Sequence, residues 1–356
     1  MSEKSPLPRR LFLQLLGGVV GGAALGSSAC QSRAPHETGA ALPLYVDDGT
    51  GWPVYRGPYL QRNAHIAAFL LPADGRKLAQ MCDRYLNDPA NRAVEYAPLV
   101  PNVFVLYAEM SIASLDARDQ ALGWTRETEL SFWVPTVARA SVGGLLVTDH
   151  LAWFLPALVV DNPYAIATGR EVFGFPKLFG QFEKPADIRR PEFDASVWGF
   201  ERLGPDAEGG MRPWLDVRRT GDGEAARTWS SWDEAWAEGI DLLLGGTEPS
   251  ARVLAMDEMD VPLVFLKQFR DASDTQRACY QALVEAPARV QQFYNGGPLE
   301  GTYHLTFHAL ESPALPQMLG LPLDASGALQ AITGLWVHLD FTLEAGTELW
   351  SANAGA

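Results

Sequence analysis

Short apolar runs with turn residues at both ends recur along this chain, and they limit the fold more than any other feature of the sequence. The segments 302–310 (TYHLTFHAL) and 334–346 (GLWVHLDFTLEAG) alternate between apolar and polar residues, as strands with one buried face do. Three further runs, at 102–110, 129–135 and 152–160, are short, apolar and strand-like. The 25 prolines and 33 glycines indicate many turns. The sequence therefore predicts a β-rich α+β protein with antiparallel strands and few helices.

Helix signals are confined to two segments. Residues 74–88 begin with Asp74, a typical N-cap, and their apolar residues recur at helical spacing. Residues 231–244 begin with a capping box, SWDE, and end before two glycines. This second helix lies in a polar, glycine-rich stretch, about 183–255, which we interpret as an elaboration of the main domain. Residues 275–286 fit both periods, so helix and strand stay open there.

The first 30 residues predict an export signal. The sequence RRLFL at 9–13 resembles a twin-arginine signal, and a 19-residue apolar stretch runs to Ala29. The SSAC sequence that ends at Cys30 resembles a bacterial lipoprotein cleavage site. A permanent membrane anchor is the alternative, because the apolar stretch is nearly long enough to span a bilayer. We expect an exported protein, periplasmic or anchored by a lipid on Cys30, with a tether over 31–50 and its main domain over 51–356.

The charge of the chain limits its partners. A net charge of -15 disfavours nucleic acid and anionic membrane surfaces, so we expect a small-molecule partner. Cys82 and Cys279 lie outside the signal, and an exporting compartment would permit a disulfide between them. Two buried free thiols are the alternative, and the sequence does not decide between them.

Common catalytic and metal-binding motifs are missing from the sequence. It has no Walker loop, no Gly-x-Ser-x-Gly elbow and no His-Glu-x-x-His zinc motif. His304 and His308 lie in an alternating strand, where their separation would be about 13 Å, so a metal site is not expected there.

Lys177 is the most unusual candidate for chemistry, because it lies in the almost wholly apolar run GREVFGFPKLFG. Its side chain either reaches solvent from a loop or is desolvated. Only a neutral amine attacks a carbonyl carbon, and a free lysine, with a pKa of about 10.4, is neutral in about one molecule in 2,500 at pH 7. An apolar pocket formed by Phe175, Leu178 and Phe179 would disfavour the ammonium and so activate the amine.

The segment 161–177 (DNPYAIATGREVFGFPK) closely resembles the signature of the acetoacetate decarboxylase family. Residues 56–59 (RGPY), 128–135 (TELSFWVP) and 265–269 (FLKQF) resemble further blocks of that family in the same order. The resemblance covers most of residues 52–350. It implies antiparallel strands around a barrel-like core and a homo-oligomeric assembly.

The resemblance also implies roles for individual residues. Lys177 would form a Schiff base with an oxo acid, and no metal or organic cofactor would be needed. Glu129 would carry protons, and it would have to be partly protonated to leave the amine reactive. Arg170 and Glu171 are expected to pair and hold the segment that presents Lys177. Phe175 is expected in the pocket wall.

Two positions depart from the family pattern. Leu178 replaces a second lysine, so that charge repulsion would give way to further desolvation next to Lys177. Ala64 occupies the place of an arginine in the opening strand, and Arg62, two residues earlier, is the expected substitute for binding the substrate.

Three functions remain open on this evidence. The first is decarboxylation of acetoacetate or a related β-keto acid through Lys177. The second is another Schiff-base reaction of an oxo acid, such as aldol cleavage, condensation or dehydration. The third is an exported protein that binds small molecules in the same fold without turnover.

Overall fold

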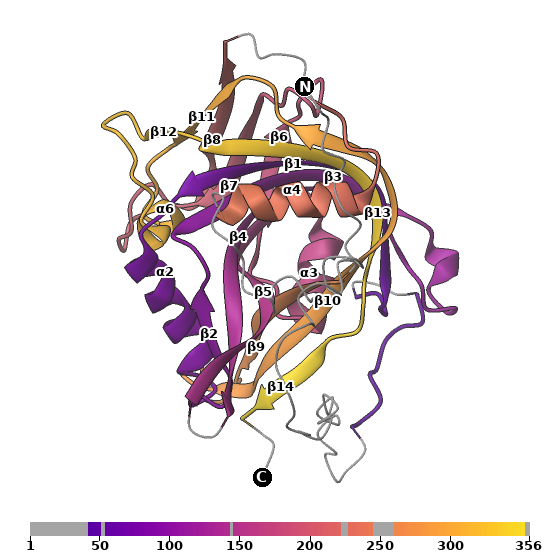
Figure 1. The fold of residues 1–356 in the computed structure, drawn as a ribbon. Helices are drawn as coiled ribbons and strands as arrows, with labels where there is room; N and C mark the ends of the chain where they lie inside the picture. Colours follow the sequence, from indigo (N-terminus) through magenta and orange to yellow (C-terminus); the bar gives the residue numbers. More distant parts are fainter. Residues whose placement is uncertain (1–41, 51–53, 143–144, 222–226, 245–259, 353–356) are drawn as a thin grey trace, which may run out of the picture. The chain divides into compact units, whose positions relative to one another are not determined.

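The computed structural model describes residues 42–50, 54–142, 145–221, 227–244 and 260–352 (Figure 1). Every described residue belongs to one compact unit, Thr38–Ala356. The predicted export signal, Cys30 and part of the tether lie outside the described residues, so export and lipidation stay predictions. Among the helices of the described ranges, none is long and apolar enough to cross a membrane.

Seven strands form a closed ring. Their order is β5-β9-β10-β13-β1-β3-β4, and β4 pairs with β5, which closes the ring. Every neighbouring pair is antiparallel except β5 and β9, which share a short parallel contact. The ring consists of β1 (Tyr59–Pro72), β3 (Asn102–Ser114), β4 (Thr125–Val142), β5 (Leu145–Val160), β9 (Asp260–Arg270), β10 (Ala278–Pro298) and β13 (Thr333–Leu343).

A second group of strands continues the sheet from β5. Strand β6 pairs with β5 in parallel, and β7, β8, β11 and β12 follow it in antiparallel order. Two short strands, β2 and β14, pair with β4 and β10. The bounds are β2 (Glu95–Pro98), β6 (Lys177–Glu183), β7 (Phe193–Gly199), β8 (Gly210–Thr220), β11 (Thr302–Phe307), β12 (Ala328–Gln330) and β14 (Thr347–Ser351). The β-rich α+β fold predicted from the sequence is confirmed.

The ring strands are buried on both faces, and alternate residues separate the two sides. On β4, for example, Leu130 and Phe132 pack in the main hydrophobic core with Trp214 of β8 and Leu305 of β11. The residues between them, such as Ser131, line a cavity on the other face. This arrangement explains why the runs 102–110, 129–135 and 152–160 within ring strands are mostly apolar, since side chains on both faces of these strands have packing neighbours.

Helices are few in the described part of the chain, as predicted. They are α2 (Gly75–Cys82) with a π-helical turn (Asp83–Asn87), α3 (Pro163–Val172), α4 (Trp232–Leu244), α6 (Leu315–Leu319) and a 3₁₀ turn (Gln120–Leu122). The Asp74 side chain accepts hydrogen bonds from two backbone N–H groups of α2, as expected for its N-cap. The Ser231 hydroxyl accepts one from the Glu234 N–H at the start of α4, which confirms that helix start.

Helix α4 runs across the ring in Figure 1, and one of its faces lines the cavity. The segment interpreted as an elaboration, about 183–255, also contains β7 and β8, which are paired members of the sheet. Side chains of these two strands pack in the main hydrophobic core.

The structure answers two questions that the sequence left open. Within the segment 275–286, residues 278–286 are part of β10, so the strand alternative is the correct one for them. Cys82, the last residue of α2, is buried, Cys279 is exposed, and no disulfide joins the two. Burial raises the pKa of the Cys82 thiol to about 12.

Candidate active site

Lys177 is the first residue of β6, and a tight turn connects it to α3. Helix α3 ends at Val172, and Gly174 then adopts a φ of 85°, a conformation that favours glycine. The backbone N–H of Lys177 donates to the Phe175 carbonyl oxygen at 2.8 Å. Its side chain is only 8% exposed. Of the two alternatives for Lys177, the structure has the buried side chain.

The amine of Lys177 has a partner that was not predicted. Its Nζ lies 2.8 Å from Oε1 of Glu127 on β4, and the Glu127 side chain is 1% exposed. A carboxylate in contact favours an ammonium, whereas the apolar surroundings disfavour any lone charge. The amine is thus paired as well as desolvated. The sequence did contain a signal for Glu127. It lies two residues before Glu129, and side chains two residues apart in a strand lie on the same face.

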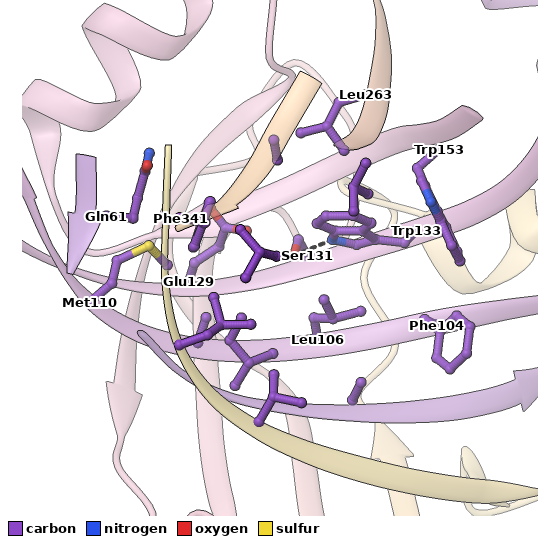
Figure 2. A pocket seen from close by; sticks show the side chains of 18 of the residues that line it. Gln61, Phe104, Leu106, Met110, Glu129, Ser131, Trp133, Trp153, Leu263 and Phe341 are labelled. Carbon is purple, nitrogen blue, oxygen red and sulfur yellow. Dashed lines mark hydrogen bonds between the residues drawn. The ribbon is translucent and has the colours of Figure 1, made fainter. Parts of the chain in front are cut away.

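Three residues of β4 follow Glu127 on the cavity side of the strand. These residues, Glu129, Ser131 and Trp133, line the cavity in alternate positions, and Figure 2 shows Glu129 beside Ser131. The Ser131 hydroxyl oxygen accepts a hydrogen bond from Nε1 of Trp133 at 2.8 Å. Burial raises the pKa of Glu129 to about 7; the charge of Lys177 opposes this shift and Glu127 adds to it. Near neutrality Glu129 is therefore partly protonated, as the sequence argument required of it.

Asp161 and Asn162 fasten the lysine segment to the glutamate strand. Asp161 Oδ1 accepts a hydrogen bond from the backbone N–H of Thr128 at 2.8 Å. Asn162 donates to the backbone carbonyl oxygen of Arg126 at 2.9 Å, and its Oδ1 caps α3. No helix was predicted at the position of α3. An N-cap asparagine followed by proline at the first helical position is a helix start, which explains the difference.

The cavity bounded by these residues has a volume of about 260 Å³ and lies inside the ring. Lys177, Glu127, Glu129, Ser131 and Gln61 are polar members of its wall, which is otherwise almost entirely apolar. Lys177, Glu127 and Gln61 also border a second cavity of about 50 Å³ on the side of α3. The amine thus lies where two cavities meet. In the described part of the chain, no cluster of three or more histidine, cysteine or acidic side chains is placed to hold a metal ion.

Gly169 and Phe175 shape the space around the lysine stem. A Cβ atom added at Gly169 would lie 3.1 Å from both Cδ and Cε of Lys177, so glycine lets the stem pass close to α3. Nζ of Lys177 lies 5.5 Å from the centroid of the Phe175 ring, which lines both cavities. The position predicted for Phe175 in the pocket wall is confirmed, whereas Phe179 is 37% exposed and lies outside that wall.

Two predicted substrate contacts do not reach the cavity. Arg62 is exposed, and its guanidinium lies 4.6 Å from the centre of the Trp124 ring. The pairing register of β1 shifts between Gln61 and Ala64, and this irregularity turns Arg62 outward while the buried Gln61 lines the cavity. Leu178 follows Lys177 in a strand, so it points to the opposite face and packs against the main core.

Arg170 and Glu171 each have a partner other than the one predicted. Arg170 donates from its guanidinium to the backbone carbonyl oxygen of Lys177 at 3.3 Å. Glu171 accepts a hydrogen bond from the Tyr45 hydroxyl, which raises the pKa of Tyr45. Neighbouring residues of a helix point in different directions, so these two cannot face each other readily. Arg170 still holds the lysine segment, through the backbone of Lys177.

Comparison with solved structures identifies the architecture. Acetoacetate decarboxylase from Legionella pneumophila superposes with a TM-score of 0.55 at 14% identity, over 92% of this chain and 99% of that one. The chain has the acetoacetate decarboxylase fold. A second acetoacetate decarboxylase structure gives a TM-score of 0.51 at 14% identity, over 87% of this chain and 100% of that one. The third structure is the enduracididine biosynthesis enzyme MppR, complexed with the condensation product of pyruvate and imidazole 4-carboxaldehyde. It superposes with a TM-score of 0.53 at 14% identity, over 88% of this chain and 98% of that one. Comparisons with protein-family models and with curated proteins gave no match.

Proposed function

We propose that the protein is a Schiff-base-forming lyase in which Lys177 is the nucleophile. The observation that carries the proposal is the buried contact between Nζ of Lys177 and Glu127, placed at the wall of the cavity inside the ring. The neutral amine attacks a carbonyl carbon, the carbinolamine loses water, and an iminium ion forms. The nitrogen cation then accepts the electron pair of a bond that breaks one carbon further along the substrate.

The two glutamates divide the proton transfers. Glu127 is in contact with Nζ and takes a proton from it, which leaves the neutral amine. Glu129, whose pKa of about 7 keeps it partly protonated near neutral pH, protonates the hydroxyl that leaves the carbinolamine as water. The resulting Glu129 carboxylate is then the base for the next step.

The charges in the cavity favour aldol-type cleavage or dehydration over decarboxylation. Of the described residues that line the cavity, Lys177 is the one cation, and it already contacts a carboxylate. A substrate carboxylate would meet Glu127 and Glu129 without an arginine to bind it. A neutral β-hydroxy ketone fits better. The Glu129 carboxylate removes its hydroxyl proton, the carbon–carbon bond breaks, an aldehyde or ketone leaves, and the enamine is protonated and hydrolysed.

Decarboxylation of a β-keto acid is the second candidate. It is supported by the segment that resembles the acetoacetate decarboxylase signature and by the shared fold. In that reaction carbon dioxide leaves the iminium ion and the same enamine forms. Both candidates require the adduct on Lys177, so one experiment addresses them together.

Trapping with borohydride tests the proposal. The purified protein is incubated with acetoacetate, with pyruvate, with 2,4-pentanedione or with the β-hydroxy ketone diacetone alcohol, and then reduced. Intact mass and peptide mapping should show an adduct on Lys177 in the parent protein and none in Lys177→Met. Lys184→Met removes an exposed lysine, paired with Glu109, and should leave the adduct in place.

The products separate the candidates. Acetone released from diacetone alcohol supports aldol-type cleavage, whereas carbon dioxide released from acetoacetate supports decarboxylation. Lack of an adduct with all four compounds would contradict the proposal and favour a protein that binds small molecules without turnover.

A further inference from the structure

The cavity extends far beyond the groups that surround Lys177. Alternate residues of β3, from Leu106 to Ile112, line it together with Phe104, and Ile112 pairs with Gln61 near the amine. The span from Leu106 to Ile112 alone corresponds to about 20 Å of strand at about 3.4 Å per residue. The cavity is therefore elongated, and Lys177 lies toward one end of it.

The two ends of the cavity differ in chemistry. Figure 2 shows Gln61 and Glu129 toward one side and Trp133, Trp153 and Phe104 toward the other. Helix α4 and the segment before it add three more aromatic rings to the wall; two of these, Trp229 and Trp232, pack in one cluster with Met110, on the side of Gln61. The five tryptophans of the wall are Trp133, Trp153, Trp229, Trp232 and Trp236. Rings of this size bury large apolar area and favour an aromatic or hydrocarbon partner.

The size of the cavity also exceeds what a small oxo acid needs. At about 30 Å³ for each water-sized group, its volume of about 260 Å³ holds roughly nine such groups. Pyruvate has six non-hydrogen atoms and would leave the tryptophan-lined part without a ligand. Water there would find few polar partners, so an apolar ligand group gains free energy by occupying it.

We propose that the substrate is a neutral ketone or aldehyde with an elongated apolar tail, which lies along β3 between the ring strands and α4. This inference rests on the proposed Schiff base at Lys177, which fixes the carbonyl at the polar end. Lys177 and the two glutamates provide no site for a free carboxylate at that end. The apolar wall provides none along the tail.

A homologous series of methyl ketones tests the tail. Acetone, 2-pentanone, 2-octanone and 2-undecanone are trapped on Lys177 with borohydride, and the half-saturating concentration is measured for each. Each added methylene should lower that concentration by roughly two- to fourfold until the cavity is filled, because each buries apolar surface. A matched acid, 10-oxoundecanoate, should bind much more weakly than 2-undecanone, since its carboxylate would enter the apolar end. Equal concentrations across the series, or equal binding of the acid, would overturn the inference.

Gly239 on α4 provides the matched variant. A Cβ atom built at Gly239 meets only Leu335 Cδ2, at 4.0 Å, so a larger side chain there projects into open cavity. Gly239→Leu also has better helix propensity than the parent, so the helix should form. The variant should raise the half-saturating concentration of 2-undecanone far more than that of acetone. An unchanged ratio between the two would overturn the assignment of the tail to this part of the cavity.

The experiments distinguish a failure of the proposed Schiff base from a failure of the proposed apolar tail. If no ketone is trapped, the proposed function fails. The tail is then tested by quenching of tryptophan fluorescence, since five tryptophans line the cavity. A dependence of quenching on chain length would support an apolar ligand, and quenching that is equal for all four ketones would overturn it.

Discussion

The ion pair between Lys177 and Glu127 leads to a sharp prediction for Lys177→Met. Methionine keeps the length and the apolar stem of lysine but removes the charge. Glu127, with 1% of its side chain exposed, would then hold an unpaired carboxylate in the cavity wall. Removal of one partner of a buried ion pair costs about 3–5 kcal/mol of unfolding free energy, because the other charge stays buried.

Uptake of a proton by the orphaned carboxyl limits this cost and makes it depend on pH. An ordinary glutamate titrates at about 4.3, so keeping it protonated at pH 7 costs about 3.7 kcal/mol, at about 1.36 kcal/mol for each pH unit. In the variant the folded state holds this proton more tightly than the unfolded state does. The penalty is therefore absent below about pH 4.3 and grows as the pH rises. We expect a loss of about 3–4 kcal/mol at pH 7 and about 1 kcal/mol at pH 5.

Urea unfolding followed by tryptophan fluorescence at pH 5 and pH 7 measures both losses. The double variant Glu127→Gln/Lys177→Met replaces both charges by neutral groups and should recover most of the stability at pH 7. Lys184→Met breaks an exposed pair with Glu109 and should cost less than about 1 kcal/mol at either pH. An equal loss for Lys177→Met at the two pH values would refute the reasoning, as would a double variant no more stable than the single one.

Three other substitutions test the site. Burial raises the pKa of Glu129 from 4.5 to about 7, so its ionisation destabilises the folded state as the pH rises above 4.5. Glu129→Gln should therefore raise the unfolding free energy by up to about 3 kcal/mol at pH 8 and leave it unchanged at pH 4. The same substitution should abolish the change in the rate of adduct formation that occurs near pH 7 in the parent protein. Gly169→Ala places a methyl group 3.1 Å from the lysine stem and should slow adduct formation by up to about 100-fold, whereas Gly204→Ala, with open space around it, should not. Arg62→Ala should leave trapping unchanged, and a marked loss would show that the guanidinium reaches the substrate.

The sequence was most informative where one pattern has one structural meaning. Alternation in 302–310 and 334–346 indicated strands, and the capping residues Asp74 and Ser231 marked helix starts. The apolar neighbours of Lys177 indicated burial as one of two alternatives, and the structure has the side chain buried. These features depend on residues that are close in the sequence, and local physical chemistry determines them.

The missed features depend on geometry that a linear pattern does not contain. The irregularity in β1 reverses which residues face inward, so Gln61 rather than Arg62 lines the cavity. The partner of Lys177, Glu127, is 50 positions away and is brought near by the path from β4 through β5 and α3 to β6. The tryptophans of α4 belong to the cavity only because that helix lies across the ring.

The contact with Glu127 also changes the explanation for how Lys177 becomes reactive. If desolvation alone activated the amine, its proton would have to pass to water outside the cavity. In the pair, the proton moves across a 2.8 Å hydrogen bond from Nζ to the carboxylate, and the net charge of the site stays the same. In the proposed reaction this transfer leaves a neutral amine beside a neutral carboxylic acid without moving net charge across the apolar wall. Burial keeps Glu129 partly protonated. In the proposed mechanism Glu127 thus prepares the nucleophile, and the apolar cavity prepares the acid.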